Sequence, residues 1–230
     1  MSEIIVMGIK ILAAVAVGFL AGHAAVFVFN RVPAVWLCDY GQDPGEELKN
    51  RSHQRLKGYP WKLLFSGFFA AGAIHLILYD VRFSLAALVF CWALLEIAIA
   101  DKKYGIIPDQ FVLLTAAAAI GFVTFQKSFL EPVWGVLLGT GIMLLAALTG
   151  KLLFKQESLG FGDVKLFAAM GLALGFKGTL TVLILSSLSC ALYLSVLLIK
   201  GRVKKDDMVP IGPCICAAGI FYVVIIWPLL

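Results

Sequence analysis

Charged residues are scarce in this chain. Aspartate, glutamate, lysine and arginine make up 14% of its 230 residues, whereas hydrophobic residues make up 61%. A soluble globular domain is closer to a quarter charged and half apolar. The mean hydropathy of +0.97 points the same way. The composition therefore excludes an ordinary soluble domain. It predicts an all-α, polytopic integral membrane protein that forms one membrane-embedded domain over residues 1–230.

Cysteine and histidine are also rare, and this excludes several kinds of site. The three histidines are scattered, and the chain has neither an HExxH zinc motif nor a GxSxG nucleophile elbow. The cysteines are odd in number and mostly lie in apolar runs, so we expect packing residues and no disulfide framework. No metal site is expected. The five cysteines are Cys38, Cys91, Cys190, Cys214 and Cys216.

Long apolar runs predict about eight transmembrane helices, several of them short enough to be tilted. The first run follows no basic segment, so we expect it to remain as a helix and not to be a signal peptide. Gly18 and Gly22 form a small-xxx-small pattern, which lets two helices approach closely. Residues 33–61 are the only long polar segment, a loop between helices one and two. The runs cover about residues 4–29, 63–79, 85–100, 111–125, 133–153, 164–176, 179–199 and 209–227.

The basic residues predict the orientation of these helices. Fifteen of the 19 lysines and arginines lie in or beside the odd-numbered loops, and cytoplasmic loops carry such an excess. The odd loops are therefore predicted to face the cytoplasm. The net charge of +5 follows this topology, so no nucleic-acid partner is expected. The fifteen are Arg31, Lys49, Arg51, Arg55, Lys57, Lys62, Lys102, Lys103, Lys151, Lys155, Lys165, Lys200, Arg202, Lys204 and Lys205.

Two aspartates stand at matching places in this topology. Asp101 ends the third apolar run, and Asp163 precedes the sixth. Both are predicted to lie at the cytoplasmic end of their helices, and a carboxylate set into an apolar segment needs a partner or a function. Each alone could be a solvated helix-end charge, and Asp163 could be an N-cap. Their equal depth instead favours a catalytic pair.

A pair of neighbouring carboxyl groups suits peptide hydrolysis. The two share one proton, because like charges at short range cannot both form readily. The charged member can take a proton from an attacking water, and the neutral member can hydrogen-bond the substrate carbonyl. This chemistry requires no cofactor. The sequence therefore predicts an aspartyl dyad of Asp101 and Asp163.

Residues around the pair are candidates for supporting roles. Gly160 and Gly162 flank the site where a peptide backbone needs clearance beside the carboxylate. Pro108 is placed to begin the fourth helix. Asp109 either caps that helix or supports the site, with structure favoured. Lys165 is either a boundary lysine or tunes the dyad, and the sequence does not separate these.

Two further acidic residues need an interpretation. Glu96 lies deeper in the third run and stays open as a pore-facing or paired residue. Asp80 follows Tyr79, which imitates the Tyr-Asp motif of presenilin-type GxGD proteases. The loop count puts Asp80 on the outer side, across the membrane from Asp163, so we interpret it as a loop residue.

Nearly the whole chain resembles the type IV prepilin peptidases, also called prepilin leader peptidases, which are GxGD membrane aspartyl proteases. Asp101 stands before Ile107-Pro108-Asp109 as the first family aspartate does, and residues 160–166, GFGDVKL, match the second family motif. Pro210-Ile211-Gly212-Pro213 is similar to the family's Pro-Phe-Gly-Pro element. Residues 18–22 and 30–33 resemble the family's N-terminal region more loosely.

The resemblance implies a function. Family members cut the short basic leader from prepilins or pseudopilins at the cytoplasmic face of the bacterial inner membrane, in pilus, competence or type II secretion systems. Many also N-methylate the new amino terminus with S-adenosylmethionine. Many carry two CxxC pairs in the first cytoplasmic loop. Here only Cys38 is present, which excludes a four-thiolate zinc site and leaves the methyltransferase activity open.

Two other classes of function compete with the protease. Membrane carboxylates often mark ion or proton paths, so a transporter or channel is an alternative, although the two aspartates share one face instead of lying at the midplane. A non-catalytic component of a pilus or secretion assembly is another. For the protease, the expected partners are prepilin or pseudopilin substrates and the lipid bilayer.

Overall fold

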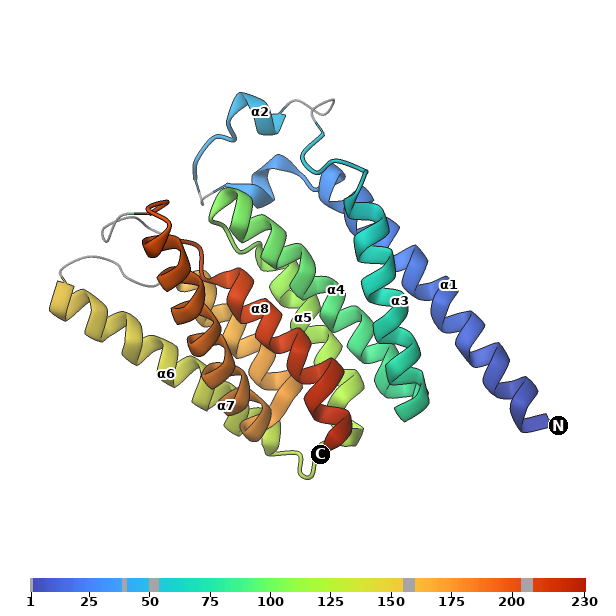
Figure 1. The fold of residues 1–230 in the computed structure, drawn as a ribbon. Helices are drawn as coiled ribbons and strands as arrows, with labels where there is room; N and C mark the ends of the chain where they lie inside the picture. The colour runs from blue at the N-terminus through green and yellow to red at the C-terminus, as the bar shows by residue number, and fades with distance from the viewer. Residues whose placement is uncertain (1, 39–40, 50–53, 155–159, 204–208) are drawn as a thin grey trace.

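The computed structural model describes residues 2–38, 41–49, 54–154, 160–203 and 209–230. These residues form helices and connecting segments, with no strand among them (Figure 1). The prediction of an all-α polytopic membrane protein is confirmed. The helices are α1 (Ser2–Arg31), η1 (Ala34–Leu37), α2 (Glu46–Lys49), α3 (Trp61–Tyr79), α4 (Val81–Tyr104), α5 (Asp109–Phe122), η2 (Val123–Phe125), α6 (Glu131–Phe154), α7 (Phe161–Ile199), α8 (Gly212–Phe221), η3 (Tyr222–Ile226) and η4 (Trp227–Leu229).

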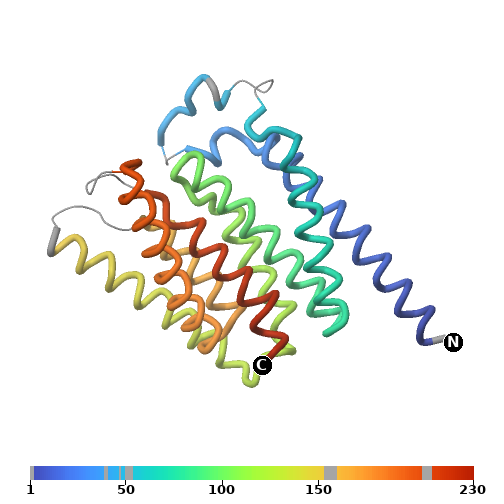
Figure 2. The backbone as a smooth tube through the Cα atoms, in the orientation of Figure 1, coloured from blue at the N-terminus to red at the C-terminus, as the bar shows by residue number. Residues whose placement is uncertain are grey.

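Six of the described helices are long and apolar enough to cross a membrane, and a shorter apolar helix covers Asp109–Phe125. One of the six, α7, is a bent pair of helices, because Gly175 has non-helical dihedral angles inside it. Counting its halves separately, the described residues contain the eight predicted apolar helices: α1, α3, α4, α5, α6, both halves of α7, and α8. Figure 2 shows both termini at the end of the bundle away from α2, as an even number of crossings requires.

The bundle is built around α4 and α7. The central helix α4 packs against α1, α3, α5 and α8, and α7 packs against α5, α6 and α8. At the end away from α2, the Phe83 ring lies edge-on to Phe122, Phe125 and Trp227, each at a centroid distance of 5.2 Å. This aromatic cluster joins the start of α4 to the ends of α5 and the C-terminal helices.

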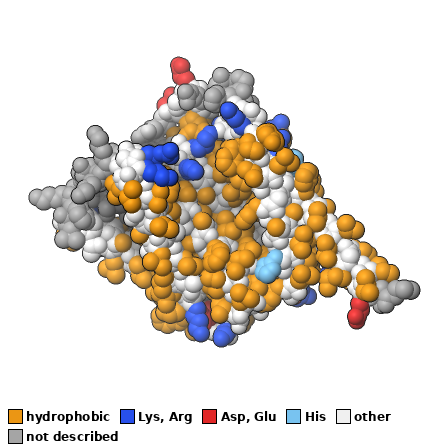
Figure 3. Space-filling view, in the orientation of Figure 1, with side chains coloured by type: hydrophobic (Ala, Val, Ile, Leu, Met, Phe, Trp, Pro, Cys, Tyr) orange, Lys and Arg blue, Asp and Glu red, His pale blue; other side chains and the backbone are white. Residues whose placement is uncertain are grey.

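Small residues allow α1 to pack closely on α3, as predicted. A Cβ added to Gly18 would lie 2.5 Å from the Cα of Ala70, and one added to Gly22 would lie 2.2 Å from the backbone nitrogen of Ser66. The N-terminal half of α1 extends beyond the rest of the bundle along one edge (Figure 1). On the face of the molecule drawn in Figure 3, the side chains are mostly hydrophobic, and lysine and arginine gather near the upper and lower ends of the bundle.

The polar segment between α1 and α3 is held on the bundle at two points. Asn30 exchanges hydrogen bonds with the backbone N–H and carbonyl of Leu56, both 2.9 Å long. The buried guanidinium of Arg55 donates to the carbonyl oxygens of Phe29, Val32 and Leu48, and so caps the end of α1. This segment therefore covers the α1 end of the bundle.

Within this segment, the structure describes one short helix, the four-residue α2, and residues 50–53 lie outside the described residues. Arg51, Lys155, Lys204 and Lys205 of the orientation argument also lie outside them.

The break between the predicted apolar runs 164–176 and 179–199 is a sharp bend in α7. Gly175 has φ 66° and ψ −173°, a conformation that other residues avoid. Side chains from the α5–α6 region satisfy backbone groups that the bend leaves open. Gln126 donates to the carbonyl oxygens of Leu172 and Ala173, and the carboxylate of Glu131 accepts from the N–H of Phe176. The bend therefore returns the second half of α7 toward the end at which the first half begins.

We predict that Gly175→Ala lowers the free energy of unfolding by about 1 to 3 kcal/mol, because alanine disfavours this backbone conformation. Its Cβ would also lie 3.3 Å from the Glu131 side chain. Thermal unfolding of the detergent-solubilised protein measures the change. Gly141→Ala is the matched control, because Gly141 lies in the helix α6 with open space where the Cβ would be. Equal unfolding midpoints for the two variants would contradict the prediction.

Candidate active site

One end of the bundle contains a cavity of about 490 Å³ that holds both aspartates. Its walls come from three parts of the chain: the segment after α1, the connection from α4 to α5, and the start of α7. All seven residues singled out from the sequence line it. These are Asp101, Pro108, Asp109, Gly160, Gly162, Asp163 and Lys165.

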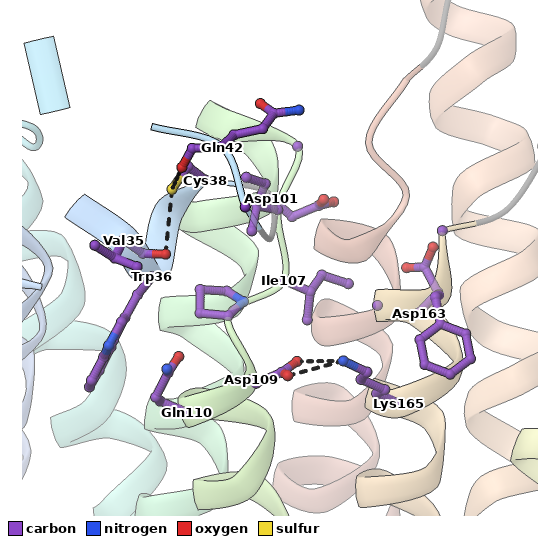
Figure 4. Close-up of a pocket in the computed structure, with 17 residues that line it drawn as sticks. Val35, Trp36, Cys38, Gln42, Asp101, Ile107, Asp109, Gln110, Asp163 and Lys165 are labelled. Carbon is purple, nitrogen blue, oxygen red and sulfur yellow. Dashed lines mark hydrogen bonds and ion pairs between the residues drawn. The ribbon is translucent and has the colours of Figure 1, made fainter. Parts of the chain in front are cut away.

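The two carboxyl groups arrive on helices that run in opposite directions. Asp101 lies in the last turn of α4, which ends at the left-handed Gly105 (φ 67°). Asp163 lies in the first turn of α7. Each residue is 7% exposed, and the two are close enough to interact electrostatically. Figure 4 shows their carboxyl groups turned toward each other across the cavity.

The carboxyl group of Asp101 has a backbone donor from another helix. The N–H of Gly212, the first residue of α8, donates to Asp101 Oδ2 at 2.9 Å. The carboxyl group of Asp163 lies beside Gly160, the N-cap of its own helix α7. A group from outside α4 therefore orients Asp101.

The two glycines of the GFGD motif have different roles in this structure. Gly162 allows close approach, because a Cβ there would lie 3.0 Å from the Cβ of Ile107 on the α4–α5 connection. Gly160 has an ordinary φ of −71°, and a Cβ there would make only normal contact with Asp163 Oδ2 at 3.5 Å. The contact with Ile107 is thus a constraint of the fold at Gly162, and the clearance for a substrate backbone at both glycines stays a prediction.

Asp109 and Lys165, which the sequence left without defined roles, bind each other. The Lys165 ammonium lies 3.0 Å from both carboxylate oxygens of Asp109 (Figure 4), and both side chains are about one-third exposed. Pro108 is the N-cap of α5, as its predicted position at a helix start requires. The ion pair joins the start of α5 to the start of α7, two residues beyond Asp163.

The remaining acidic candidates lie elsewhere. Asp80 accepts a hydrogen bond from the N–H of Phe83 at 2.9 Å and so caps α4, at the opposite end of that helix from Asp101. Glu96 is fully buried, and neither carboxyl oxygen has a hydrogen-bond partner among the described residues. Glu96 does not belong to the set that lines the cavity.

Sequence reasoning missed several residues of the cavity wall. Val35, Trp36, Cys38, Gly41 and Gln42 come from the segment after α1. Their place in the wall depends on the anchoring of that segment by Asn30 and Arg55, which no local pattern indicates. Gly212 was part of a quoted motif, but its contact with Asp101 was not predicted.

Comparisons with known proteins identify the family of this chain. Residues 88–195, which include both aspartates, match the model of the type IV leader peptidase family. The leader peptidase HopD of Escherichia coli is 31% identical over 139 residues, which are 59% of this chain and 84% of HopD. The chain belongs to the type IV leader peptidase family.

Other members of the leader peptidase family are longer than this chain. The prepilin leader peptidase/N-methyltransferase of Burkholderia pseudomallei is 32% identical over 163 residues, which are 70% of this chain and 52% of that protein. The protein of the same name from Xanthomonas campestris is 34% identical over 146 residues, 61% of this chain and 49% of that protein. The chain thus spans about half the length of these relatives. No solved structure gives a significant match.

We predict that the Asp109–Lys165 pair has a measurable but small coupling. Asp109→Asn and Lys165→Gln should each lower the unfolding midpoint, and the double variant should lose less than the sum. Because both side chains are partly exposed, we expect a coupling of about 0.5 kcal/mol. A double-mutant cycle of thermal unfolding in detergent measures it. Strict additivity would show that the contact contributes nothing to stability.

Proposed function

We propose that this chain is a membrane aspartic endopeptidase that removes the short basic leader from type IV prepilins or pseudopilins. The observation that carries the proposal is the placement of Asp101 and Asp163, two buried and interacting carboxyl groups, in one cavity at the end of the bundle. The family membership and the names of the relatives supply the class of substrate.

In the proposed reaction the two aspartates divide the work of a general base and a general acid. A water between them loses a proton to the charged carboxylate as its oxygen attacks the scissile carbonyl carbon. The protonated partner hydrogen-bonds the carbonyl oxygen and stabilises the developing charge. The tetrahedral intermediate then collapses, the C–N bond breaks, and the departing amine takes a proton from the dyad. No cofactor takes part in this scheme.

The cavity suits an extended peptide. Its volume of about 490 Å³ lies within the usual range for ligand sites, about 300 to 1,000 Å³. Trp36, Ile107 and Phe161 give it apolar walls, whereas Gln42 and the Asp109–Lys165 pair give it polar ones. A peptide bond held between the carboxyl groups of Asp101 and Asp163 would contact both. A transporter would instead need a path to the other side, and these carboxyl groups share one end of the bundle.

We also propose that the dyad end faces the cytoplasm. The support is the excess of lysine and arginine in the loops at this end. Cleavage at this face would leave the basic leader on the cytoplasmic side and the following hydrophobic helix in the bilayer.

Methyl transfer to the new amino terminus is a second candidate activity, because several relatives are named N-methyltransferases. The residues of the α1–α3 segment nearest the site argue against a separate donor site there. Trp36, Cys38 and Gln42 line the aspartate cavity itself, so S-adenosylmethionine bound against them would occupy the space proposed for the peptide. We therefore assign no step to S-adenosylmethionine in this chain.

We predict that Asp101→Asn and Asp163→Asn each reduce leader cleavage by about 1,000-fold or more, since an amide cannot relay the proton. The assay mixes the purified full chain in detergent with a prepilin and determines the product's new N-terminus by mass spectrometry. Added S-adenosylmethionine tests the methyl transfer in the same experiment, because methylation adds the mass of one methyl group.

Asp80→Asn is the matched control, because Asp80 lies at the far end of α4 and asparagine caps a helix as well as aspartate does. This variant should cleave like the wild type. If the wild type cuts none of several prepilins, the proposed protease function is wrong. A transporter or a component of a pilus or secretion assembly then becomes the favoured function. Cleavage that survives both dyad substitutions would show that other groups perform the chemistry.

We predict opposite labelling of two single cysteines placed in a cysteine-free background. The two substitutions are Glu46→Cys and Ser128→Cys. Glu46 is an exposed residue of α2 at the dyad end, and Ser128 is an exposed residue of the loop before α6. A membrane-impermeant maleimide applied to intact cells should label position 128 alone. In inverted membrane vesicles it should label position 46 alone. The reverse pattern would place the dyad on the outer face.

A further inference from the structure

The N-terminus of α8 directly contacts the candidate catalytic residue Asp101. The first four N–H groups of a helix have no partner inside it. That of Gly212 donates to Asp101 Oδ2 at 2.9 Å, across 111 positions of sequence. The neighbouring Pro213 has no N–H to offer. The Gly212 amide is therefore the group with which α8 orients this carboxylate.

The approach is so close that only glycine fits. A Cβ added to Gly212 would lie 2.6 Å from Asp101 Oδ2 and 2.9 Å from Asp101 Cγ. Real Cβ atoms essentially never come this near to another heavy atom, so either α8 or the carboxyl group would have to move.

The rest of α8 leaves it little freedom to move. Ile215 and Cys216 are at most 2% exposed, and α8 packs on both α4 and α7. The carbonyl of Ile211, just before Gly212, accepts from the N–H of Cys214 within the helix and from the thiol of Cys190 on α7. Because α8 is held at its start and along its length, the Asp101 side chain is the part that would yield.

We propose that Gly212 is a positioning residue for the peptidase reaction, acting through Asp101. Its N–H occupies Oδ2 and so fixes the rotation of the carboxyl group, which leaves Oδ1 for the attacking water and for the proton shared with Asp163. This inference rests on the proposed peptidase function. It adds a third element, the start of α8, to a dyad whose two carboxyl groups come from α4 and α7.

The test is the kinetics of Gly212→Ala in the prepilin cleavage assay. A carboxyl group displaced by about 1 Å should lower kcat by about 100-fold. KM should stay near the wild-type value, because Gly212 is not among the residues that line the cavity.

Gly219→Ala is the matched control on the same helix. Its Cβ would meet the ends of the flexible Met170 and Leu94 side chains, far along α8 from the dyad. This variant should lose stability but keep the wild-type kcat. Equal losses of kcat in the two variants would mean that a general destabilisation of α8 causes the loss, and this would overturn the inference.

A second measurement tests the contact without relying on catalysis. Asp101→Ala removes the two atoms nearest to a Cβ at position 212 and leaves its own Cβ 3.2 Å away. Gly212→Ala should therefore lower the unfolding midpoint in the wild-type background and much less in the Asp101→Ala background. Equal shifts of the unfolding midpoint in the two backgrounds would show that a Cβ at position 212 does not contact the Asp101 side chain, contrary to the inference.

The donor itself is tested by replacing Gly212 with glycolic acid in cell-free translation, which exchanges the N–H for an ester oxygen and adds no side chain. This change should lower kcat in the same direction as alanine. If the wild type cleaves and both Gly212 variants keep its kcat, the inference fails while the peptidase function stands. If the wild type does not cleave, the proposed function fails and the inference fails with it.

Discussion

Two carboxyl groups held together inside an apolar bundle are the constraint on which the rest of this structure depends. Neither Asp101 nor Asp163 reaches bulk water freely, so the protein must supply their hydrogen-bond donors. Gly212 does so for Asp101 with its backbone N–H, and Gly160 at the N-terminus of α7 lies beside the carboxyl group of Asp163. Free N–H groups occur at the N-terminal ends of helices, and this explains why the site lies where α7 and α8 begin.

The supports around the site join α7 to α5 and to the connection between α4 and α5. The Asp109–Lys165 ion pair ties α5 to α7, and the close contact of Gly162 with Ile107 fixes the separation of the two aspartate-bearing segments. At the far end, the bend at Gly175 and the cluster around Phe83 hold the helices together. Both halves of α7 can thus reach the dyad end, and α6 packs against the bent helix.

Much of this could be predicted from the sequence, because hydropathy and charge act locally. The apolar runs located the helices, and the positions of Asp101 and Asp163 within them indicated a shared depth. Contacts between distant segments could not be predicted in this way. The pairing of Asp109 with Lys165 spans 56 positions, and that of Gly212 with Asp101 spans 111.

The hydrogen bond that Asp101 receives from α8 comes from the backbone and involves no side chain of α8. An ion pair such as Asp109–Lys165 can be rebuilt with other residues, by exchanging the charges or by replacing lysine with arginine. A backbone amide offers no such alternatives, because every residue except proline carries the same N–H group. Any residue other than glycine at position 212 would add a Cβ, for which there is no space. Position 212 should consequently tolerate almost no substitution, although glycine has no functional side chain that would mark it as part of an active site.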